Sequence, residues 1–64
     1  MKVVCISTFI GAYKIKNITI GNKYDAKFTF NGDILIKNDL DELKMVNFKN
    51  FIKFNKYINY EKSN

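Results

Sequence analysis

The sequence predicts an all-β domain, a small barrel of five short strands, from three observations. The chain has 64 residues, which suits one domain with one small core. Short runs of β-branched and aromatic residues are separated by turn-forming clusters, and an Asn-Gly pair is a strong hairpin signal. A barrel pairs its own edges, which suits several short strands with tight turns. An α+β roll with a C-terminal helix is the alternative.

The first strand is predicted at "KVVCISTF", residues 2–9, because this run is short, β-branched and aromatic. Both of its faces are fairly apolar, as expected for a strand curled inside a barrel. Residues 10–17 contain a Gly and two Lys without a clear period. We interpret them as a long loop, which could be folded as an irregular hairpin.

The second strand follows a turn at Gly21, where glycine can adopt a positive φ. From Lys23 onward apolar and polar residues alternate, which is the period of a strand with one buried face. The predicted core face of this strand consists of Tyr24, Ala26, Phe28 and Phe30.

The hairpin after this strand has a register that the apolar residues can select. A three-residue loop at 31–33 places Ile34 opposite Phe30 and Ile36 opposite Phe28. A two-residue loop would send both isoleucines to the polar face. We therefore predict the three-residue loop, with its Gly or its Asp in the left-handed conformation.

The second half of the chain is predicted to contain a turn at 37–42 and a strand at 43–48. The aromatic segment that follows fits a helix or a strand. Because Asn and aromatic residues are indifferent helix formers, we prefer a tight 3₁₀ turn at 48–50 and a short strand at 51–54. The predicted organisation is a barrel over residues 1–54 and a tail over residues 55–64 that is helical or loose.

The net charge of +5 suggests nucleic acid, since lysines release counterions from a phosphate backbone. However, Lys, Asn, Ile, Phe and Tyr dominate the composition, and their codons are AT-rich. The basic residues also include no Arg, whose planar fork reads guanine and clamps phosphate. The charge is therefore weak evidence for nucleic acid.

The N-terminal apolar run is too short for a signal peptide, and Ser7 and Thr8 interrupt it. No apolar run approaches the ~20 residues that span a bilayer. A lone free thiol fits a reducing compartment. We expect a cytoplasmic protein that contacts no membrane.

Catalysis and metal binding lack their usual residues. The chain has no His, and Cys5 lies in the most apolar strand without a partner to lower its pKa. Cys5 is explained as a small buried hydrophobe. The acidic group Asp39, Asp41 and Glu42 lacks the spacing of a calcium loop, and Asp at turns usually bonds its own backbone. We expect no enzyme, no cofactor and no metal site.

The order of the motifs resembles the small SH3-like barrel proteins common in bacteriophages and low-GC bacteria. In that family a "KVVCI"-like strand precedes an "LTxGKxY" turn, and an "NDxGE" turn follows later, before a closing Phe. The matching residues here are Thr19, Gly21, Lys23 and Tyr24, with Asn22 in place of the family's Lys, then Asn38 and Asp39, with Asp41 or Leu40 in place of the Gly, and Phe51. The resemblance covers residues 2–54. It implies an SH3-like barrel and a phage origin but no activity, since these motifs are structural.

Two segments are candidate binding sites. After residue 48 lysines alternate with aromatic residues, which is typical of single-strand nucleic-acid binding, although a small core also needs its aromatics. The resemblance implies that the long first loop lines a ligand groove, whereas Tyr13 and Ile15 capping an open barrel end is the alternative. The candidate partner-binding residues are Tyr13, Lys14, Lys16, Lys49, Lys53, Phe54, Lys56, Tyr57 and Tyr60.

The favoured hypothesis is a small non-enzymatic phage protein that binds a host protein and inhibits or redirects it. Its positive charge would speed docking onto an acidic partner. Nucleic-acid binding through the Lys and aromatic face is the second hypothesis, and a self-associating virion component is the third. We expect a monomer or a small homo-oligomer.

Overall fold

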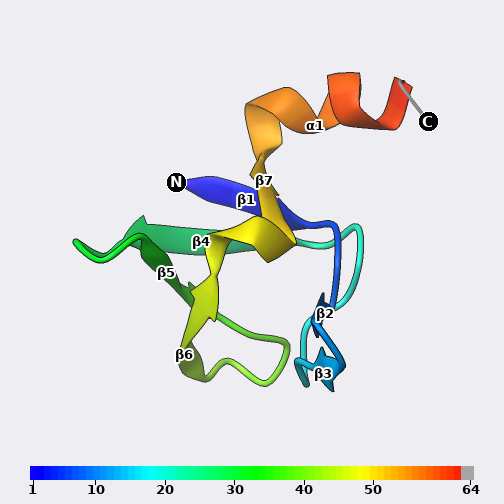
Figure 1. Cartoon of the computed structure of the whole chain (residues 1–64). Coiled ribbons are helices and arrows are strands. Elements are labelled where there is room, and N and C mark those ends of the chain that lie inside the picture. Colours follow the sequence, from blue (N-terminus) through cyan, green and yellow to red (C-terminus); the bar gives the residue numbers. More distant parts are fainter. Residues whose placement is uncertain (63–64) are drawn as a thin grey trace.

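Antiparallel pairing joins five strands into one sheet, in the order β6-β5-β4-β1-β7, and two short strands form a separate hairpin (Figure 1). The computed structural model describes residues 1–62. Within them the elements are β1 (Lys2–Cys5), β2 (Phe9–Ile10), β3 (Tyr13–Lys14), β4 (Lys23–Phe28), β5 (Asp33–Lys37), β6 (Leu43–Asn47), the 3₁₀ turn η1 (Phe48–Asn50), β7 (Phe51–Lys53) and the helix α1 (Phe54–Lys62). The fold is mostly β, and it includes the C-terminal helix of the alternative prediction.

The sheet does not close into a barrel within the described residues, contrary to the prediction that the strands pair all their edges. β6 and β7 are the two outer strands of the sheet. The hairpin β2–β3 lies near β6 but pairs only with itself (Figure 1). The space between β6 and this hairpin is therefore open.

The first strand is shorter than predicted because the backbone after Cys5 hydrogen-bonds outside the sheet ladder. β1 ends at Cys5, and the amides of Ile6 and Ser7 then donate to the carbonyl oxygen of Asn50, at 2.9 and 3.3 Å. These bonds turn the chain out of the sheet. Residues 10–17 consequently contain part of an irregular hairpin, one of the two forms predicted for them.

The core is made of the side chains that alternate onto one face of the sheet. Val3, Ile34 and Ile36 are fully buried, and burying such a side chain contributes about 1.5–3 kcal/mol to folding. The rings of Tyr24 and Phe51 meet edge to face, with centroids 6.0 Å apart. The buried cluster comprises Val3, Cys5, Ile18, Tyr24, Ala26, Ile34, Ile36, Val46 and Phe51.

The register of the β4–β5 hairpin differs from the predicted one. Ile34 pairs with Phe28 and Ile36 pairs with Ala26, so each isoleucine lies two residues from its predicted partner. A shift of two residues keeps both isoleucines on the core face. The predicted face is thus correct at Tyr24 and Ala26, which are buried, but Phe28 at the end of β4 and Phe30 beyond it are exposed.

The loop itself explains the shift. Both the amide and the hydroxyl of Thr29 donate to the carbonyl oxygen of Asp33, each at 2.9 Å, which closes a three-residue loop at 30–32. Gly32 adopts a φ of +90°, the left-handed conformation that such loops need at their last position. Phe30 therefore lies at the loop tip in full contact with solvent.

Asn38 organises the predicted turn between β5 and β6. Its buried amide oxygen accepts from the amides of Leu40 and Glu42, at 2.9 and 3.0 Å. Asp41 adopts a φ of +61°, in the left-handed region that Asp tolerates better than most residues. Asp41 therefore has the conformation for which glycine is the usual choice.

The C-terminal elements follow the prediction closely. The side chain of Asn47 caps η1 by accepting from the amide of Lys49 at 2.8 Å, and β7 follows directly. The tail is helical to residue 62, and the rest of the predicted tail, 63–64, lies outside the described residues. α1 packs on β1 and β7, and Val4, which lies outside the core cluster, is fully buried. No helix in this part of the chain is long and apolar enough to cross a bilayer.

Candidate protein-binding groove

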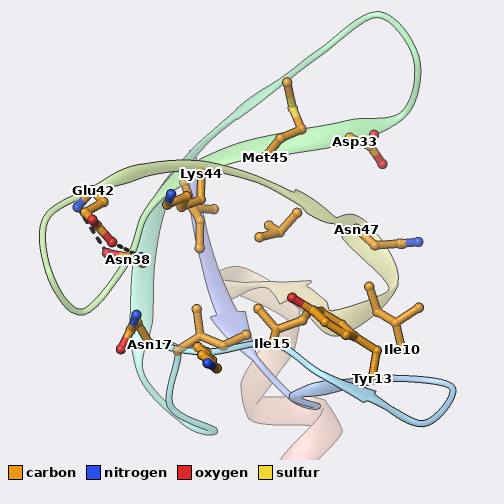
Figure 2. Close-up of a pocket in the computed structure, with 14 residues that line it drawn as sticks. Ile10, Tyr13, Ile15, Asn17, Asp33, Asn38, Glu42, Lys44, Met45 and Asn47 are labelled. Carbon is orange, nitrogen blue, oxygen red and sulfur yellow. Dashed lines mark hydrogen bonds between the residues drawn. The ribbon is translucent and has the colours of Figure 1, made fainter.

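A groove of about 580 Å³ lies between the edge strand β6 and the segment from Ile10 to Ile18 (Figure 2). Core residues Ile36 and Val46 reach its floor. Met45 lies on the β6 side of the groove, and Ile10 lies on the hairpin side. The groove is therefore the open seam of the unclosed sheet.

The walls of the groove expose apolar side chains that the core does not use. Tyr13 is 67% exposed and Ile10 is 44% exposed, whereas Met45, which is 55% exposed, directs its side chain away from the groove interior (Figure 2). Contiguous exposed apolar surface beside a concavity commonly marks a binding site in a monomeric protein. Ile15 is different, because it is half-buried and packs against the core.

The hairpin wall is held in place by a buried amide. The side chain of Asn50 in η1 donates to the carbonyl oxygens of Ser7 and Phe9, at 3.0 and 2.8 Å. The amide of Ile15 donates to the carbonyl oxygen of Thr8 at 2.7 Å, which closes the base of the hairpin. These bonds satisfy backbone groups and position the hairpin beside β6 rather than on it.

A polar junction between two of the sequence motifs adjoins the groove at Asn17 and Asn38. The hydroxyls of Thr19 and Tyr24 donate to the carboxylate of Asp39, at 2.7 and 2.6 Å, and the amide of Thr19 donates to the Tyr24 hydroxyl at 2.8 Å. The amide of Asp39 donates to the carbonyl oxygen of Asn17 at 2.8 Å. Burial, and then the hydrogen bond to Asp39, raise the pKa of Tyr24. Asp39 is thus engaged in joining two loops.

The charges of the groove are unevenly placed. Lys16 and Lys44 line it together with Glu42, whose carboxylate accepts from the side-chain amide of Asn38 at 3.2 Å. Figure 2 shows Lys44, Glu42 and Asn38 together at one end, with Asp33 toward the other. The ion pair among the described residues, Lys2 with Asp25, lies on the exterior and holds the pKa of Asp25 below its usual value. The groove lining therefore carries two lysines and the carboxylates of Glu42 and Asp33, with Lys44 and Glu42 at the same end.

The predicted site residues do not form one cluster. Tyr13 and Lys16 line the groove, and Lys14 lies beside them on β3. Lys49 lies in η1 and Lys53 ends β7. Figure 1 shows the hairpin and α1, which carries the remaining four residues, on opposite sides of the sheet. Those four are Phe54, Lys56, Tyr57 and Tyr60.

The aromatic residues of α1 are engaged with neighbours. The Lys23 ammonium lies 4.5 Å from the centroid of the Phe54 ring. The Tyr57 hydroxyl lies 3.8 Å from where a side chain on Gly21 would begin, and the Tyr57 and Tyr60 rings stack with centroids 6.1 Å apart. The pKa of Tyr57 is raised, chiefly because its hydroxyl donates a hydrogen bond to Glu61. These rings are thus engaged with neighbours, while Phe54 and Tyr60 remain partly exposed, at 40% and 38%.

The sequence prediction missed the β6 side of the groove. Lys44, Met45 and Asn47 line the groove but were treated only as strand residues. The alternation along residues 43–48 contained a signal, since it places Lys44 on the same face as the buried Val46 and Met45 on the opposite face. Lys44 can be recognised as a groove residue only when the neighbouring hairpin is placed.

The groups considered for chemistry are used structurally. Burial raises the pKa of the Cys5 thiol, so the thiolate needed for nucleophilic chemistry is disfavoured. Asp39 and Glu42 accept hydrogen bonds within the fold. The described residues contain no group of three His, Cys, Asp or Glu side chains arranged to hold a metal ion.

Comparison of the chain with protein-family profiles, with curated proteins and with solved structures found no match.

Proposed function

We propose that this chain is a non-enzymatic module with an SH3-like, open-barrel architecture that binds another protein in the groove beside β6. The strand order supports this architecture: β1 lies between β4 and β7, β4 to β6 form a meander, and η1 precedes the last strand. The long connection between β1 and β4 carries the hairpin that lines the groove, and the resemblance of the motifs implies a long first loop in that role. Fold alone does not give function, so the groove must carry the proposal.

The exposed apolar wall of the groove is the observation that carries the proposal. A 64-residue chain needs its apolar side chains for its core, yet Tyr13 and Ile10 remain exposed on one wall of the groove, at 67% and 44%. Binding a protein would remove this surface from water. The groove contains no arrangement of nucleophile and base, which supports a binding rather than a catalytic role.

The resemblance of the motifs to phage proteins supports a host protein as the partner, which the chain would inhibit or redirect in the host cytoplasm. The positive net charge favours an acidic partner surface. Nucleic-acid binding has weaker support, because Phe54 and Tyr57 pack against the domain and the predicted lysines come from separate elements. It remains an outcome of the experiment below.

Affinity capture from host lysate with wild-type protein and two matched variants tests the proposal. Tyr13→Ser removes an exposed apolar residue of the groove, whereas Leu40→Ser removes one that is similarly exposed, at 62%, in the 38–42 turn. We expect wild type and Leu40→Ser to retain the same stoichiometric protein and Tyr13→Ser to lose it. Neither substitution touches the core, so all three proteins should be equally folded by circular dichroism.

Two results would contradict the proposal. The first is a partner retained equally by wild type and Tyr13→Ser, which would place binding elsewhere on the surface. The second is retention of DNA or RNA with a steep dependence on salt and no protein partner, which would favour the nucleic-acid alternative.

A further inference from the structure

We propose that the partner enters the groove as a single extended segment that adds a strand to the free edge of β6. This inference rests on the proposed function and states the kind of partner that the groove accepts. The segment would pair its backbone with β6 and place alternate apolar side chains on the groove floor. A carboxylate of the segment would lie at the end of the groove that carries Lys44.

The hydrogen-bond pattern of the β5–β6 ladder shows which backbone groups are already used. The amide of Asn38 donates to the carbonyl oxygen of Glu42 at 2.9 Å, which marks this as a hydrogen-bonded position at the end of the ladder. In an antiparallel ladder the hydrogen-bonded positions alternate. The backbone groups of Lys44 and Val46 therefore face β5.

The intervening residues, Leu43, Met45 and Asn47, direct their amides and carbonyl oxygens away from β5. That direction is outward from the sheet, because β6 is its outer strand, and Met45 and Asn47 line the groove. A strand added here would lie about 4.8 Å from β6, within reach of these donors and acceptors. The edge thus presents a five-residue template for pairing.

The side-chain environment fits the same occupant. Successive side chains of an added strand would point alternately to the floor and away from it. The floor is apolar, at Ile36 and Val46, and Ile15 and Ile18 also line the groove. The segment should therefore carry apolar residues at every second position.

Charge complementarity orients the segment. Lys44 lies at the end of the groove near Asn17 and Asn38 (Figure 2), and Lys16 directly precedes Asn17. The structure pairs neither lysine with an acid among the described residues. A Glu or Asp in the segment would meet Lys44 there, beside a Glu42 carboxylate that already accepts from the side-chain amide of Asn38, while Asp33 would disfavour an acidic residue at the other end.

The hairpin explains why the occupant is one segment and not a second copy of this chain. β2 and β3 stand opposite β6 and form the other wall of the groove, so a segment that pairs with β6 lies between β6 and the hairpin. A second copy would bring its own hairpin into the same space when its β6 approached. An isolated extended segment has no such obstacle.

Selection from a displayed library of short random peptides tests this inference on the full chain. Wild type should enrich peptides with apolar residues at alternate positions and an acidic residue toward one end. The dissociation constant of the best peptide is then measured for wild type, Met45→Pro and Met45→Ala. Proline removes the outward amide without breaking the β5–β6 ladder, whereas alanine shortens the side chain and keeps the amide.

We expect Met45→Pro to bind about tenfold or more weakly than Met45→Ala, because backbone pairing is lost. Asn47→Pro and Asn47→Ala provide a second pair in case Met45→Pro does not fold. Asn47 has a φ of −77°, close to that of proline, and both of its variants lose the same cap on η1.

N-methylation of single amides in the selected peptide gives a readout on the unaltered protein. Only every second N-methyl group should weaken binding, since only alternate peptide amides face β6. Equal binding by the proline and alanine variants, or no alternation on N-methylation, would overturn the strand proposal while leaving the proposed function intact. Failure of any peptide to be enriched would also overturn it, and the lysate experiment would then judge the proposed function alone.

Sedimentation of the wild-type chain adds one further outcome. A concentration-dependent dimer that Met45→Pro abolishes and Met45→Ala retains would make a second copy the occupant of the edge. That result would overturn the assignment of the groove to a foreign segment.

Discussion

The polar junction and the groove lie on either side of residues 17 and 18, yet they differ in how far their side chains are buried and hydrogen-bonded. In the junction, Thr19, Tyr24 and Asp39 satisfy one another through short hydrogen bonds, and Tyr24 is almost wholly buried. In the groove, Tyr13 and Ile10 expose large apolar side chains, and β6 is an outer strand of the sheet. The junction therefore stabilises the fold, whereas the groove exposes apolar side chains and a strand edge to solvent.

This difference shows that the regular sequence motifs and the groove have different roles. The junction is built from two turn segments, around Thr19 and Asp39, and the side-chain oxygens of Thr19, Tyr24 and Asp39 all have hydrogen-bond partners there. The groove comes mainly from the less regular hairpin and from one side of β6. We therefore expect the binding surface where exposed side chains contribute little to the stability of the fold.

The largest contrast is expected between Ile34→Ala and Met45→Ala. Ile34 is fully buried, so the truncation leaves a cavity and should lower the free energy of unfolding by about 2–5 kcal/mol. Met45 lies at the groove, so its truncation should change that free energy by no more than about 0.5 kcal/mol. Urea unfolding measures both, and a comparable loss in the two variants would show that the groove also supports the fold.

A smaller effect is expected at the junction from Tyr24→Phe. The change removes the hydroxyl that bonds both Thr19 and Asp39, and the unpaired groups should cost about 1–3 kcal/mol. Tyr13→Phe is the matched control, since it removes the same hydroxyl from an exposed side chain in the groove. If the two variants unfold at the same urea concentration, the junction is not the structural element described above.

The raised pKa of Tyr24 predicts a smaller effect that depends on pH. The unfolded tyrosine ionises near its ordinary pKa of about 10, while the folded one stays neutral to higher pH. The associated stability is complete below the unfolded pKa and is lost as the pH rises through the folded pKa. Tyr24→Phe should therefore reduce the fall in stability above about pH 10.

Cys5 must be controlled in that experiment, because burial raises its pKa and gives a contribution of the same sign. The pH series is therefore compared with and without Tyr24→Phe in a Cys5→Ala background. An identical alkaline slope in the two proteins would contradict the assignment to Tyr24.

The smallest effect is expected from Asp41→Gly in the 38–42 turn. Asp41 adopts a φ of +61°, which glycine reaches without strain, although glycine also loses more entropy on folding. We expect a net stabilisation of up to about 1 kcal/mol, seen as a higher midpoint in urea. Leu40→Gly is the control at a neighbouring position without a positive φ, and it should destabilise.

Much of the scaffold could be predicted from residues close together in the chain. The alternation around Tyr24, the glycine after Ile20, the cluster at Asn38 and the tight turn before Phe51 are local signals, and each is present in the structure. The hairpin register was wrong because the hydrophobic pattern has a period of two. A shift of two residues leaves that pattern unchanged, and only the bonds between Thr29 and Asp33 distinguish the two registers.

The groove could not be predicted in this way, because it depends on contacts between distant residues. The side chain of Asn50 binds the carbonyl oxygen of Ser7, forty-three positions earlier, and so holds the hairpin beside β6 instead of on it. Local residue patterns thus specified the strands, most of their turns and the apolar core face. Long-range packing left the β6 edge open, exposed Met45 and separated the predicted lysines, since exposure depends on which distant segments meet.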